Sequence, residues 1–489
     1  MAKFTFMVFN SLSLIWSYTG QRRGDELAYL NIDPTISPNI YIISLSLFLS
    51  PYTKQNMKTY SYPKFVVHII ISFLPLVISK PSNIYLDLMH VDSGRGFTKL
   101  ELLQRMTFRT NARSTALFTK TVKPTNPLST PIHPGNGDVP YDREYLVSFS
   151  IGTPPQSVML TLDTGSDLIW TQCVPCIQCF EKGLPFYNPS NSSTFAYLSC
   201  LSDLCTSLSM AACHQQCFYL YEYGDGSATL GSVSTETFTF GSKSKVVIPD
   251  ISFGCGFLNG GVFVSNESGI LGLGRGPISL ISQLGFGAFS YCFTSLFGSK
   301  SSPLVLGPAT NFYNNSIKST PLIRNPTSPS FYYLNLTGIT VGKSLLHIPP
   351  SSFELHDNGT GGVVIDSGTA ITVLNDAAYK LVRKAFIHQL NLPIANESIT
   401  YLDLCFTLPK SSRNVEVPKF VFHFENVDLE LPSENYIYED RSSQELCLVM
   451  ISSGDTSTII GNYQQQNIHI FYDLQKEKMS FIPAQCDKL

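Results

Sequence analysis

The chain has 489 residues, which is too many for one compact core and predicts at least two domains plus additional segments. Hydrophobic residues make up 43% of the chain and charged residues only 14%, while 33 Gly and 30 Pro supply many turns, which favours compact β-rich domains. The net charge of −3 divides unevenly: 14 Lys+Arg stand against 6 Asp+Glu before Asp138, and 19 against 30 from Asp138 onward. This acidic body argues against nucleic acid as a partner, because phosphate binding requires Lys and Arg.

Residues 65–79 form an apolar run, FVVHIIISFLPLVIS, which follows Lys58 and Lys64 and ends in the small residue Ser79. This arrangement is typical of a signal peptide, and Met57 offers a start directly upstream, so we assign residues 57–79 to a signal peptide. The run is too short for a good membrane span, so no stable membrane insertion is expected after its removal. We interpret residues 1–56 as a mispredicted extension of the reading frame; the alternative is a genuine membrane-anchoring leader.

Residues 80–137 separate this signal from the acidic body. Residues 100–118 have apolar side chains at helical spacing and carry Arg105, Arg109 and Arg113 four residues apart, which predicts an amphipathic basic helix. The Pro- and Thr-rich residues 121–137 are typical of a linker. A basic helix and a linker ahead of an acidic domain indicate a removable prosegment; the alternative is an ordinary surface helix.

Strand patterns dominate the chain from Tyr145 onward. Segments such as YLVSFSIGTP, VMLTLDTGSDLIW, GGVVIDSG and NIHIFYDL alternate apolar with polar or small residues, which predicts β-strands. Residues 376–390, DAAYKLVRKAFIHQL, carry the clearest helix signal. The body is therefore predicted to be mainly β.

An internal repeat is the most informative feature of the body. Asp163-Thr164-Gly165-Ser166 follows the apolar run VMLTL, and Asp366-Ser367-Gly368-Thr369 follows the apolar run VVI. Each loop is followed later by two apolar residues and a glycine, at 270–272 and at 459–461. A single Asp-Thr-Gly can be a turn capped by its Asp, but two matched loops with matched partners are difficult to obtain by chance.

With these loops in place, the chain resembles the pepsin family of aspartic proteases, and most closely its nepenthesin-type plant members. The resemblance rests on several motifs: HVDSGRGFTKLELLQR (90–105), DTGSDLIWTQC (163–173), YGDGS (223–227), GILGLGRGP (269–277), FSYC (289–292), IDSGT (365–369), LPSENY (431–436) and IIGNYQQQN (459–467). It implies an all-β, bilobal pepsin-like fold with the active-site cleft between an N-terminal lobe (138–318, with a Cys-rich insert at 173–217) and a C-terminal lobe (319–489). It also implies a monomeric enzyme that acts on peptides or proteins and needs no cofactor or metal.

The resemblance assigns the catalytic role to Asp163 and Asp366. Two carboxylates this close share one proton, so the ionised member can activate a water while the protonated member donates to the carbonyl oxygen, and activity is expected at acidic pH. The remaining residues of the two loops are expected to support this dyad: Thr164, Gly165, Ser166, Ser367, Gly368 and Thr369. Tyr223 and Gly224 match the flap of the family, which closes over substrate, and Trp170 matches the residue that supports the flap tyrosine.

All twelve Cys lie between Cys173 and Cys486, and six Asn-x-Ser/Thr sequons lie in the same region, at Asn191, Asn266, Asn314, Asn335, Asn358 and Asn396. Together with a signal peptide these features indicate an oxidising, secretory route with disulfides and glycosylation, although spacing alone leaves the connectivity open. The resemblance implies six disulfides: Cys173–Cys176, Cys179–Cys255, Cys200–Cys217, Cys205–Cys213, Cys292–Cys486 and Cys405–Cys447. The absence of a saposin-like insert favours the apoplast over the vacuole.

Other classes of function fit the sequence less well. No H-E-x-x-H occurs, and the zinc-like spacing of Cys173, Cys176 and Cys179 has nothing else organised around it. A Gly-x-Ser-x-Gly motif of a serine hydrolase is also missing. The main alternative is a non-proteolytic binding or inhibitor protein on the same fold, and both intact Asp loops argue against it. Ala370 departs from the family, in which this position often carries Ser or Thr that hydrogen-bonds substrate.

Overall fold

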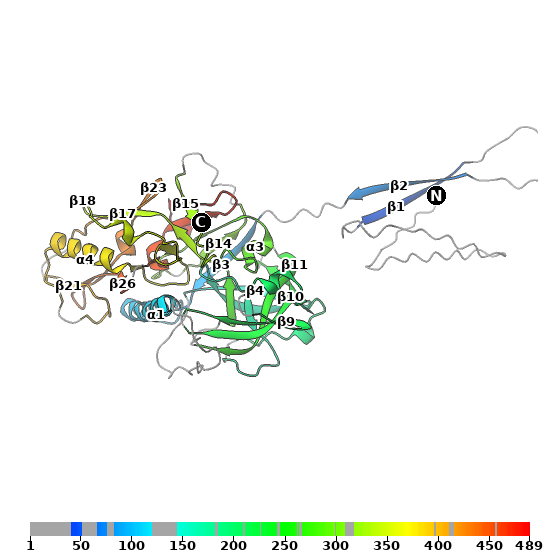
Figure 1. Cartoon of the computed structure of the whole chain (residues 1–489), viewed down its shortest axis with the longest axis horizontal. Helices are drawn as coiled ribbons and strands as arrows, with labels where there is room; N and C mark the ends of the chain where they lie inside the picture. Colours follow the sequence, from blue (N-terminus) through cyan, green and yellow to red (C-terminus); the bar gives the residue numbers. More distant parts are fainter. Residues whose placement is uncertain are drawn as a thin grey trace, which may run out of the picture. The chain divides into compact units, whose positions relative to one another are not determined.

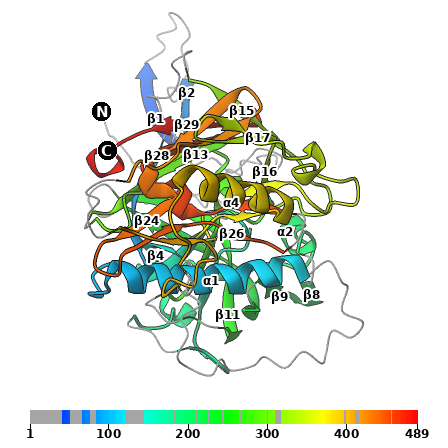
Figure 2. The same ribbon diagram turned by 90° about the vertical axis from the view of Figure 1, so that its left-hand side faces the viewer.

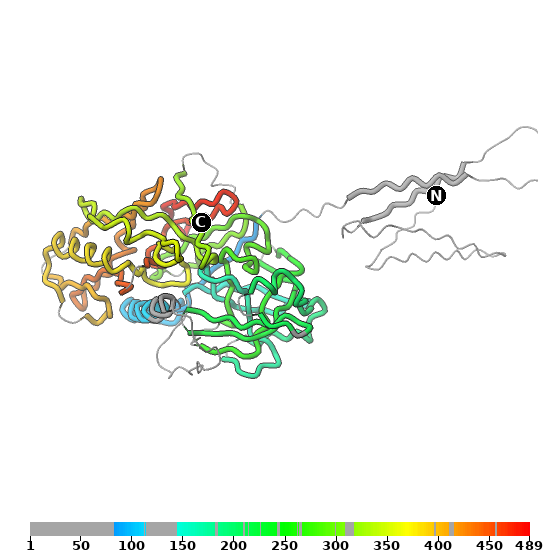
Figure 3. Tube along the Cα trace, in the orientation of Figure 1, coloured from blue at the N-terminus to red at the C-terminus, as the bar shows by residue number. Residues whose placement is uncertain are grey.

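A computed structural model describes residues 41–50, 66–75, 83–119 and 144–489, apart from short gaps at 181–183, 209–210, 225, 242–244, 262, 264–266, 299, 309–316, 396–397, 410–414 and 455–456 (Figure 3). The chain divides into two compact units, Met1–Lys80 and Pro81–Leu489. In the first unit, β1 (Tyr41–Ser50) pairs antiparallel with β2 (Val66–Pro75). Most of residues 1–79 lie outside the described part, so the signal peptide and the mispredicted extension stay predictions. No helix among the described residues is long and apolar enough to cross a membrane.

The second unit is predominantly β-sheet, as the alternating patterns predict, and it has two lobes (Figure 1). The elements of its first half are β3 (Ile84–His90), α1 (Lys99–Thr119), β4 (Tyr145–Ile151), β5 (Gln156–Asp163), β6 (Trp170–Gln172), β7 (Ala196–Tyr197), α2 (Asp203–Thr206), β8 (Ala211–His214), β9 (Gln216–Glu222), β10 (Ala228–Phe240), β11 (Val246–Gly260), β12 (Gly269–Gly272), α3 (Leu280–Leu284), β13 (Ala288–Cys292) and β14 (Ser302–Leu306). Those of its second half are β15 (Ser319–Ile323), β16 (Tyr332–Leu334), β17 (Leu336–Val341), β18 (Ser344–Leu345), β19 (Val363–Ile365), β20 (Val373–Leu374), α4 (Asp376–Leu390), β21 (Cys405–Thr407), β22 (Phe420–Phe424), β23 (Val427–Leu431), β24 (Ile437–Asp440), β25 (Glu445–Leu448), β26 (Ile451–Ser452), β27 (Thr458–Ile460), β28 (Ile468–Asp473) and β29 (Lys478–Pro483). The predicted helix at 376–390 is α4.

Strand pairing joins the two halves into one hydrogen-bonded network. β13 from the first half pairs antiparallel with β28 from the second, with Tyr291 opposite Ile470. Two smaller sheets stand apart in the second half, β18-β17-β22-β23 and β21-β25-β24. Because the alternating strands bury one face each, a single large core of buried aliphatic and aromatic side chains runs through both halves.

The first strand of the second unit, β3, lies inside the main sheet. It pairs antiparallel with β4 on one side and with β14 on the other. Ile84, Leu86 and Leu88 are buried, while Tyr85 and Met89 alternate with them and are exposed. This segment, which the sequence assigns to a prosegment, therefore contributes to the core of the body.

Helix α1 begins at a capping box and lies at the boundary between the lobes. The Thr98 hydroxyl accepts from the Glu101 N–H at 3.2 Å, and the Glu101 carboxylate accepts from the Thr98 N–H at 2.7 Å. Leu103 and Met106 are fully buried against residues of the C-terminal lobe that include Ile371. Figure 2 shows α1 running across the molecule, with α4 on one side of it and β9 and β11 on the other.

The disulfides correct four of the six implied pairings. The structure has Cys173–Cys255, Cys176–Cys179, Cys200–Cys213 and Cys205–Cys217, in place of Cys173–Cys176, Cys179–Cys255, Cys200–Cys217 and Cys205–Cys213. The remaining two, Cys292–Cys486 and Cys405–Cys447, are as the resemblance implied.

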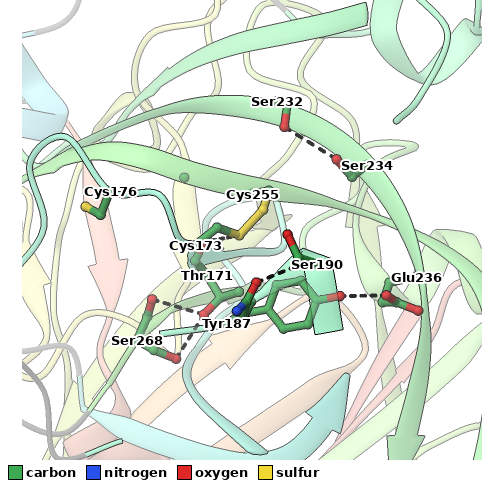
Figure 4. The surroundings of a disulfide bond; sticks show 12 residues. Thr171, Cys173, Cys176, Tyr187, Ser190, Ser232, Ser234, Glu236, Cys255 and Ser268 are labelled. Atoms are coloured by element: carbon green, nitrogen blue, oxygen red, sulfur yellow. Dashed lines mark hydrogen bonds between the residues drawn. A yellow bond between two sulfur atoms is a disulfide. The ribbon is translucent and has the colours of Figure 1, made fainter. Parts of the chain in front are cut away.

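Strand register and burial explain the corrected pairings. β6 runs parallel to β11 with Thr171 opposite Cys255, so the Cys173 side chain reaches Cys255 directly (Figure 4). Cys205 and Cys217 are both buried in one apolar cluster, whereas Cys213 is exposed. Neither feature is encoded in the spacing of the cysteines along the chain.

Candidate active site

Two parallel strand pairings place Asp163 and Asp366. β5 runs parallel to β12, with Asp163 opposite Gly272, and β19 runs parallel to β27, with Ile365 opposite Ile460. The apolar-apolar-Gly segments of the sequence repeat are these partner strands. Each Asp therefore leaves a buried strand at an equivalent position in its own half.

The two carboxylates meet at one cation. Asp163 and Asp366 are each 1% exposed. Nη2 of Arg113, from α1, donates to Oδ1 of Asp163 at 2.9 Å and to Oδ2 of Asp366 at 2.8 Å. The shared nitrogen holds both carboxyl groups within hydrogen-bonding reach of one point, which is the spacing that a shared proton or a bridging water requires.

Hydroxyl and amide donors orient each carboxylate from within its own loop. Ser166 Oγ donates to Asp163 at 2.6 Å, and Thr369 Oγ1 donates to Asp366 at 2.7 Å. Backbone N–H groups add to this: that of Gly165 lies 3.2 Å from Asp163 Oδ1, and that of Gly368 lies 2.9 Å from Asp366 Oδ1. These contacts keep the carboxyl planes from rotating when their environment changes.

The two loops are tied to each other by a reciprocal pair of hydrogen bonds. The Thr164 N–H donates to Ser367 Oγ at 3.1 Å, and the Ser367 N–H donates to Thr164 Oγ1 at 2.9 Å. Glycine is required at the closest approach, because a Cβ on Gly165 would lie 3.0 Å from Asp366 Oδ1 and a Cβ on Gly368 would meet Asp163 Oδ1. All six supporting residues predicted from the sequence therefore lie around the two carboxyl groups.

The predicted flap residues are joined by a hydrogen bond. Trp170 Nε1 donates to the Tyr223 hydroxyl at 2.8 Å, and both side chains are buried. Tyr223 stands at the turn between β9 and β10, where the Gly226 N–H donates to its carbonyl oxygen at 3.1 Å and Gly224 lies in the turn. The aromatic ring at the hairpin tip is thus held by a residue seven positions after Asp163.

A buried ion cluster attaches α1 to the start of the body. Arg109 donates through Nε to Glu144 at 2.6 Å and through Nη1 to Asp92 at 3.0 Å. Arg105 also bonds Asp92 at 2.8 Å, and His90 bonds Glu144 at 2.8 Å. Burial opposes ionisation of Glu144, yet the Arg109 guanidinium and His90 leave its pKa below the ordinary value; Asp92 is shifted in the same direction, by Arg109, His90 and Arg105 against its own burial.

Several further residues support the site; two of them lie in the FSYC and IIGNYQQQN motifs, but the sequence does not indicate their contacts. Gln465 Nε2 donates to the Ile460 carbonyl at 2.9 Å, and its Oε1 accepts from the Tyr291 hydroxyl at 2.7 Å. Tyr291 in turn bonds Tyr472 at 2.8 Å. This network is fully buried beneath the Asp366 loop, and only long-range strand pairing brings its members together.

The predicted glycosylation sites are partly described. Asn191 and Asn358 are exposed, and Asn335 is half-buried with its amide donating to Glu425 at 3.0 Å. Asn266, Asn314 and Asn396 lie outside the described residues. The described accessible sequons are thus placed where a glycan could be attached.

Potential metal ligands gather at one place in the described part of the chain, Cys405, Glu445 and Cys447. The two sulfurs there are joined in a disulfide, which removes them as thiolate ligands. Neither Asp163 nor Asp366 belongs to this group.

Comparison with known proteins decides the family. Aspartic proteinase nepenthesin-1 of Nepenthes gracilis is 46% identical over 410 residues, covering 83% of this chain and 91% of the relative. The chain belongs to the nepenthesin-like plant members of the pepsin family of aspartic proteases. Nepenthesin-2 of the same plant is 44% identical, covering 82% of this chain and 89% of the relative. The predicted family and its enzyme class, aspartic-type endopeptidase, are confirmed.

Two further comparisons support the fold. The family descriptions "Xylanase inhibitor N-terminal" and "Xylanase inhibitor C-terminal" match residues 145–308 and 331–483 of the nepenthesin-like chain. A crystal structure of edgp aligns with a TM-score of 0.61 at 18% identity, covering 84% of this chain and 96% of that one. Basic 7S globulin from soybean aligns with a TM-score of 0.56 at 19% identity, covering 70% and 93%. These likenesses agree with the predicted all-β bilobal fold.

Proposed function

We propose that the chain is a secreted aspartic endopeptidase, made as a zymogen, which hydrolyses peptide bonds at acidic pH with Asp163 and Asp366. The observation that carries the proposal is the convergence of both buried carboxylates on a single nitrogen, with matched hydroxyl and amide donors behind them. A water molecule in place of that nitrogen would contact both carboxyl groups at once.

The chemistry follows from one shared proton. The ionised carboxyl takes a proton from the water while the water oxygen attacks the peptide carbonyl carbon. The protonated carboxyl donates its proton to the carbonyl oxygen. The tetrahedral intermediate then collapses as a proton passes to the leaving amine, and no covalent bond to the enzyme forms. Above the acidic range both carboxyls ionise, so the donor is lost and the rate falls.

The same geometry supports the zymogen. Arg113 occupies the point where the water would bind, and α1 buries Leu103 and Met106 against the C-terminal lobe. Peptide substrate cannot reach the carboxylates while α1 lies there. Removal of residues 80–137 by cleavage after α1 would free the site. The substrate class is peptide or protein, and nothing in the proposed mechanism calls for a cofactor.

Secretion to the apoplast is supported by the composition of the body. Every one of the twelve Cys is in a disulfide, which is typical of proteins that mature in an oxidising compartment. The apolar run at 65–79 would supply the signal, and the sequons would be glycosylated on the same route.

The proposal is tested by cleavage of a quenched-fluorescence peptide library from pH 2 to 8, with and without pepstatin. The full-length chain is first treated with acid, alongside Asp163→Asn, Asp366→Asn and the matched control Asp376→Asn, which changes an exposed carboxylate of the same lobe. We expect acidic, pepstatin-sensitive cleavage that falls on the order of a thousandfold in the first two variants and is kept in the control. Undiminished cleavage by Asp366→Asn would refute the assignment.

A binding or inhibitor protein is the second candidate, because the matched family descriptions are those of xylanase inhibitors. The two intact Asp loops argue against it. If the folded, processed wild-type chain cleaved no peptide across the whole pH range, this candidate would be favoured and Ala370 would be the first residue to substitute.

A further inference from the structure

A third carboxylate lies beside the pair but takes no part in the proposed chemistry. Asp167 follows Ser166 in the first loop and is 9% exposed. At the equivalent position of the second loop stands Ala370. Since a buried charge is costly unless it is bonded, the contacts of Asp167 indicate what it is for.

Within its own half, Asp167 organises the glycine-rich segment that follows β12. Its Oδ1 accepts from the Gly276 N–H at 2.8 Å. A Cβ on Gly274 or on Gly276 would overlap the Asp167 carboxyl oxygens, so this segment can wrap around the carboxylate only as glycine. The Gly274 N–H also donates to the Ser166 carbonyl at 2.8 Å. The segment 273–276 is thereby fixed to the loop that carries Asp163.

The same segment is bonded to the other half of the molecule. Ser330 donates its hydroxyl to Asp167 Oδ2 and accepts the Arg275 N–H at its carbonyl oxygen, at 3.0 Å. Tyr332 donates its hydroxyl to the Leu273 carbonyl at 2.7 Å. The Arg275 guanidinium, which is 5% exposed, donates to the Ile323 carbonyl at 2.9 Å and to Glu477. We call Asp167, Arg275, Ser330 and Tyr332 the interlobe clasp.

Strand pairing connects the clasp to the residue that precedes Asp366. Tyr332 belongs to β16, which pairs antiparallel with β19, and the residue opposite Tyr332 is Ile365. Ile365 directly precedes Asp366. Asp163 is thus linked to Asp366 through Asp167, Ser330 and two adjacent strands, independently of the reciprocal Thr164 and Ser367 bonds.

We propose that the interlobe clasp positions the two catalytic carboxylates, setting their separation once α1 and Arg113 have left. This inference rests on the proposed function, because it concerns the geometry of the same pair. The residues of the interlobe clasp do not contact the reacting oxygens of either carboxylate, so they are positioning residues. Displacements well below 1 Å between catalytic groups are enough to reduce a rate severalfold.

The charges around the pair allow a specific readout. In addition to Arg113, Asp167 interacts electrostatically with Asp163, and Tyr291 and Tyr472 interact electrostatically with Asp366; both tyrosines are neutral in acid. Burial raises the pKa of Asp167, and the nearby charge of Asp163 adds to the rise, against the bonds from Ser330 and Gly276. Because two coupled carboxyls titrate as a pair, moving them apart narrows the pH interval in which one proton is shared.

The test compares kcat, KM and the width of the pH–rate profile for the acid-treated full-length chain and four variants. Ser330→Ala removes the hydroxyl bond to Asp167, and Arg275→Met independently removes the guanidinium bonds to the Ile323 carbonyl and to Glu477. Ser330→Thr keeps the hydroxyl and serves as the conservative rescue. Arg324→Met is the matched control, because Arg324 bonds the same Glu477 as Arg275 but is 70% exposed.

We expect Ser330→Ala and Arg275→Met to lower kcat about tenfold with KM changed less than about twofold, and to narrow the pH profile. Ser330→Thr and Arg324→Met should match the wild type. Wild-type kcat and profile width in both clasp variants would overturn the inference while leaving the proposed function in place. If Arg275→Met fails to fold, Ser330→Ala alone decides, with its thermal unfolding measured in parallel. An inactive wild-type chain would refute the proposed function and the inference with it.

Discussion

The loops that begin at Asp163 and Asp366 have nearly the same internal chemistry but different neighbours. In both, a hydroxyl three residues later and a glycine two residues later bond the carboxylate. The next position differs: Asp167 bonds the opposite lobe, whereas Ala370 packs in the cluster that contains Leu103 and Met106 of α1. Asp167 therefore ties the first loop to the opposite lobe, whereas the second loop packs against α1, the helix that the proposed zymogen would lose on activation.

The largest expected effect comes from removing the cation that joins the two loops. In Arg113→Met the two carboxylates lose their shared donor. Removing one partner of a buried ion pair destabilises the folded state by about 3–5 kcal/mol, which here weakens the binding of α1 over the site. We expect the unprocessed chain to cleave peptide on the order of a hundredfold faster than unprocessed wild type at about pH 5. Cleavage is measured before any change in chain length is visible on a gel.

Arg105→Met is the matched control for that change, because it removes the same charge from the same helix. The Arg105 side chain bonds Asp92, not the pair of carboxylates. Equal activation by Arg105→Met would show that general loosening of α1, and not the contact of Arg113, controls access.

A pH shift is expected when the attachment of α1 is weakened. The pKa values of Glu144 and Asp92 are below their ordinary values, so their contribution to stability is present above those ordinary values and is lost as pH falls through the lowered ones. Wild-type α1 should therefore stay bound until the pH drops below about 4. In Glu144→Gln, Arg109 loses its charged partner Glu144, and release should occur at higher pH. Intrinsic fluorescence or limited proteolysis across pH 3 to 7 measures the midpoint.

Asp87→Asn, which changes an exposed carboxylate of the same leading segment, provides the control for that titration. A release midpoint that is the same in Glu144→Gln as in wild type would contradict the role of the ion cluster.

The reciprocal bonds between the loops should contribute a smaller, coupled effect. Thr164→Val and Ser367→Ala each remove one hydroxyl acceptor from a buried backbone N–H, at a cost of about 1–3 kcal/mol. We expect each to lower kcat about tenfold, with the double variant losing less than the product of the two. A double-mutant cycle on kcat measures this; strictly additive losses would indicate that the loops act separately.

The smallest effect is expected at the flap. Tyr223→Phe deprives the buried Trp170 N–H of its acceptor, which costs on the order of 1 kcal/mol, and should lower kcat/KM severalfold. Tyr197→Phe removes the same atom from a side chain that is 53% exposed and should change nothing. If Tyr223→Phe were as active as Tyr197→Phe, the hydrogen bond between Trp170 and Tyr223 would have no role in catalysis.

Sequence alone predicts the parts of the site that are local and repeated. The apolar run before each Asp, the hydroxyl residue three positions later and the matched apolar-apolar-Gly segment predict both loops and their parallel partner strands. Arg105, Arg109 and Arg113 at intervals of four predict one basic face of a helix, and the structure places that face against Asp92, Glu144 and the pair.

The rest depends on long-range packing. Asp167 and Ser330 are 163 residues apart, and their bond depends on the register of β16 against β19. The correct disulfides likewise depend on the parallel register of β6 and β11, which local cysteine spacing cannot reveal. The sequence pattern does not distinguish the three arginines, and it is the tertiary fold that brings Arg113 to both carboxylates.

Autocatalytic activation by the Asp163 and Asp366 pair can be followed directly in a single sample. The purified full-length chain is moved from pH 7 to pH 3, and its amino-terminal sequence and its cleavage of a quenched peptide are measured in the same aliquots, for wild type and for Asp366→Asn. We expect wild-type activity to rise as chains beginning after α1 replace the full-length chain, while Asp366→Asn keeps its original terminus and stays inactive. Peptide cleavage by Asp366→Asn, or full activity at the outset from chains that still carry α1 bound, would contradict this expectation.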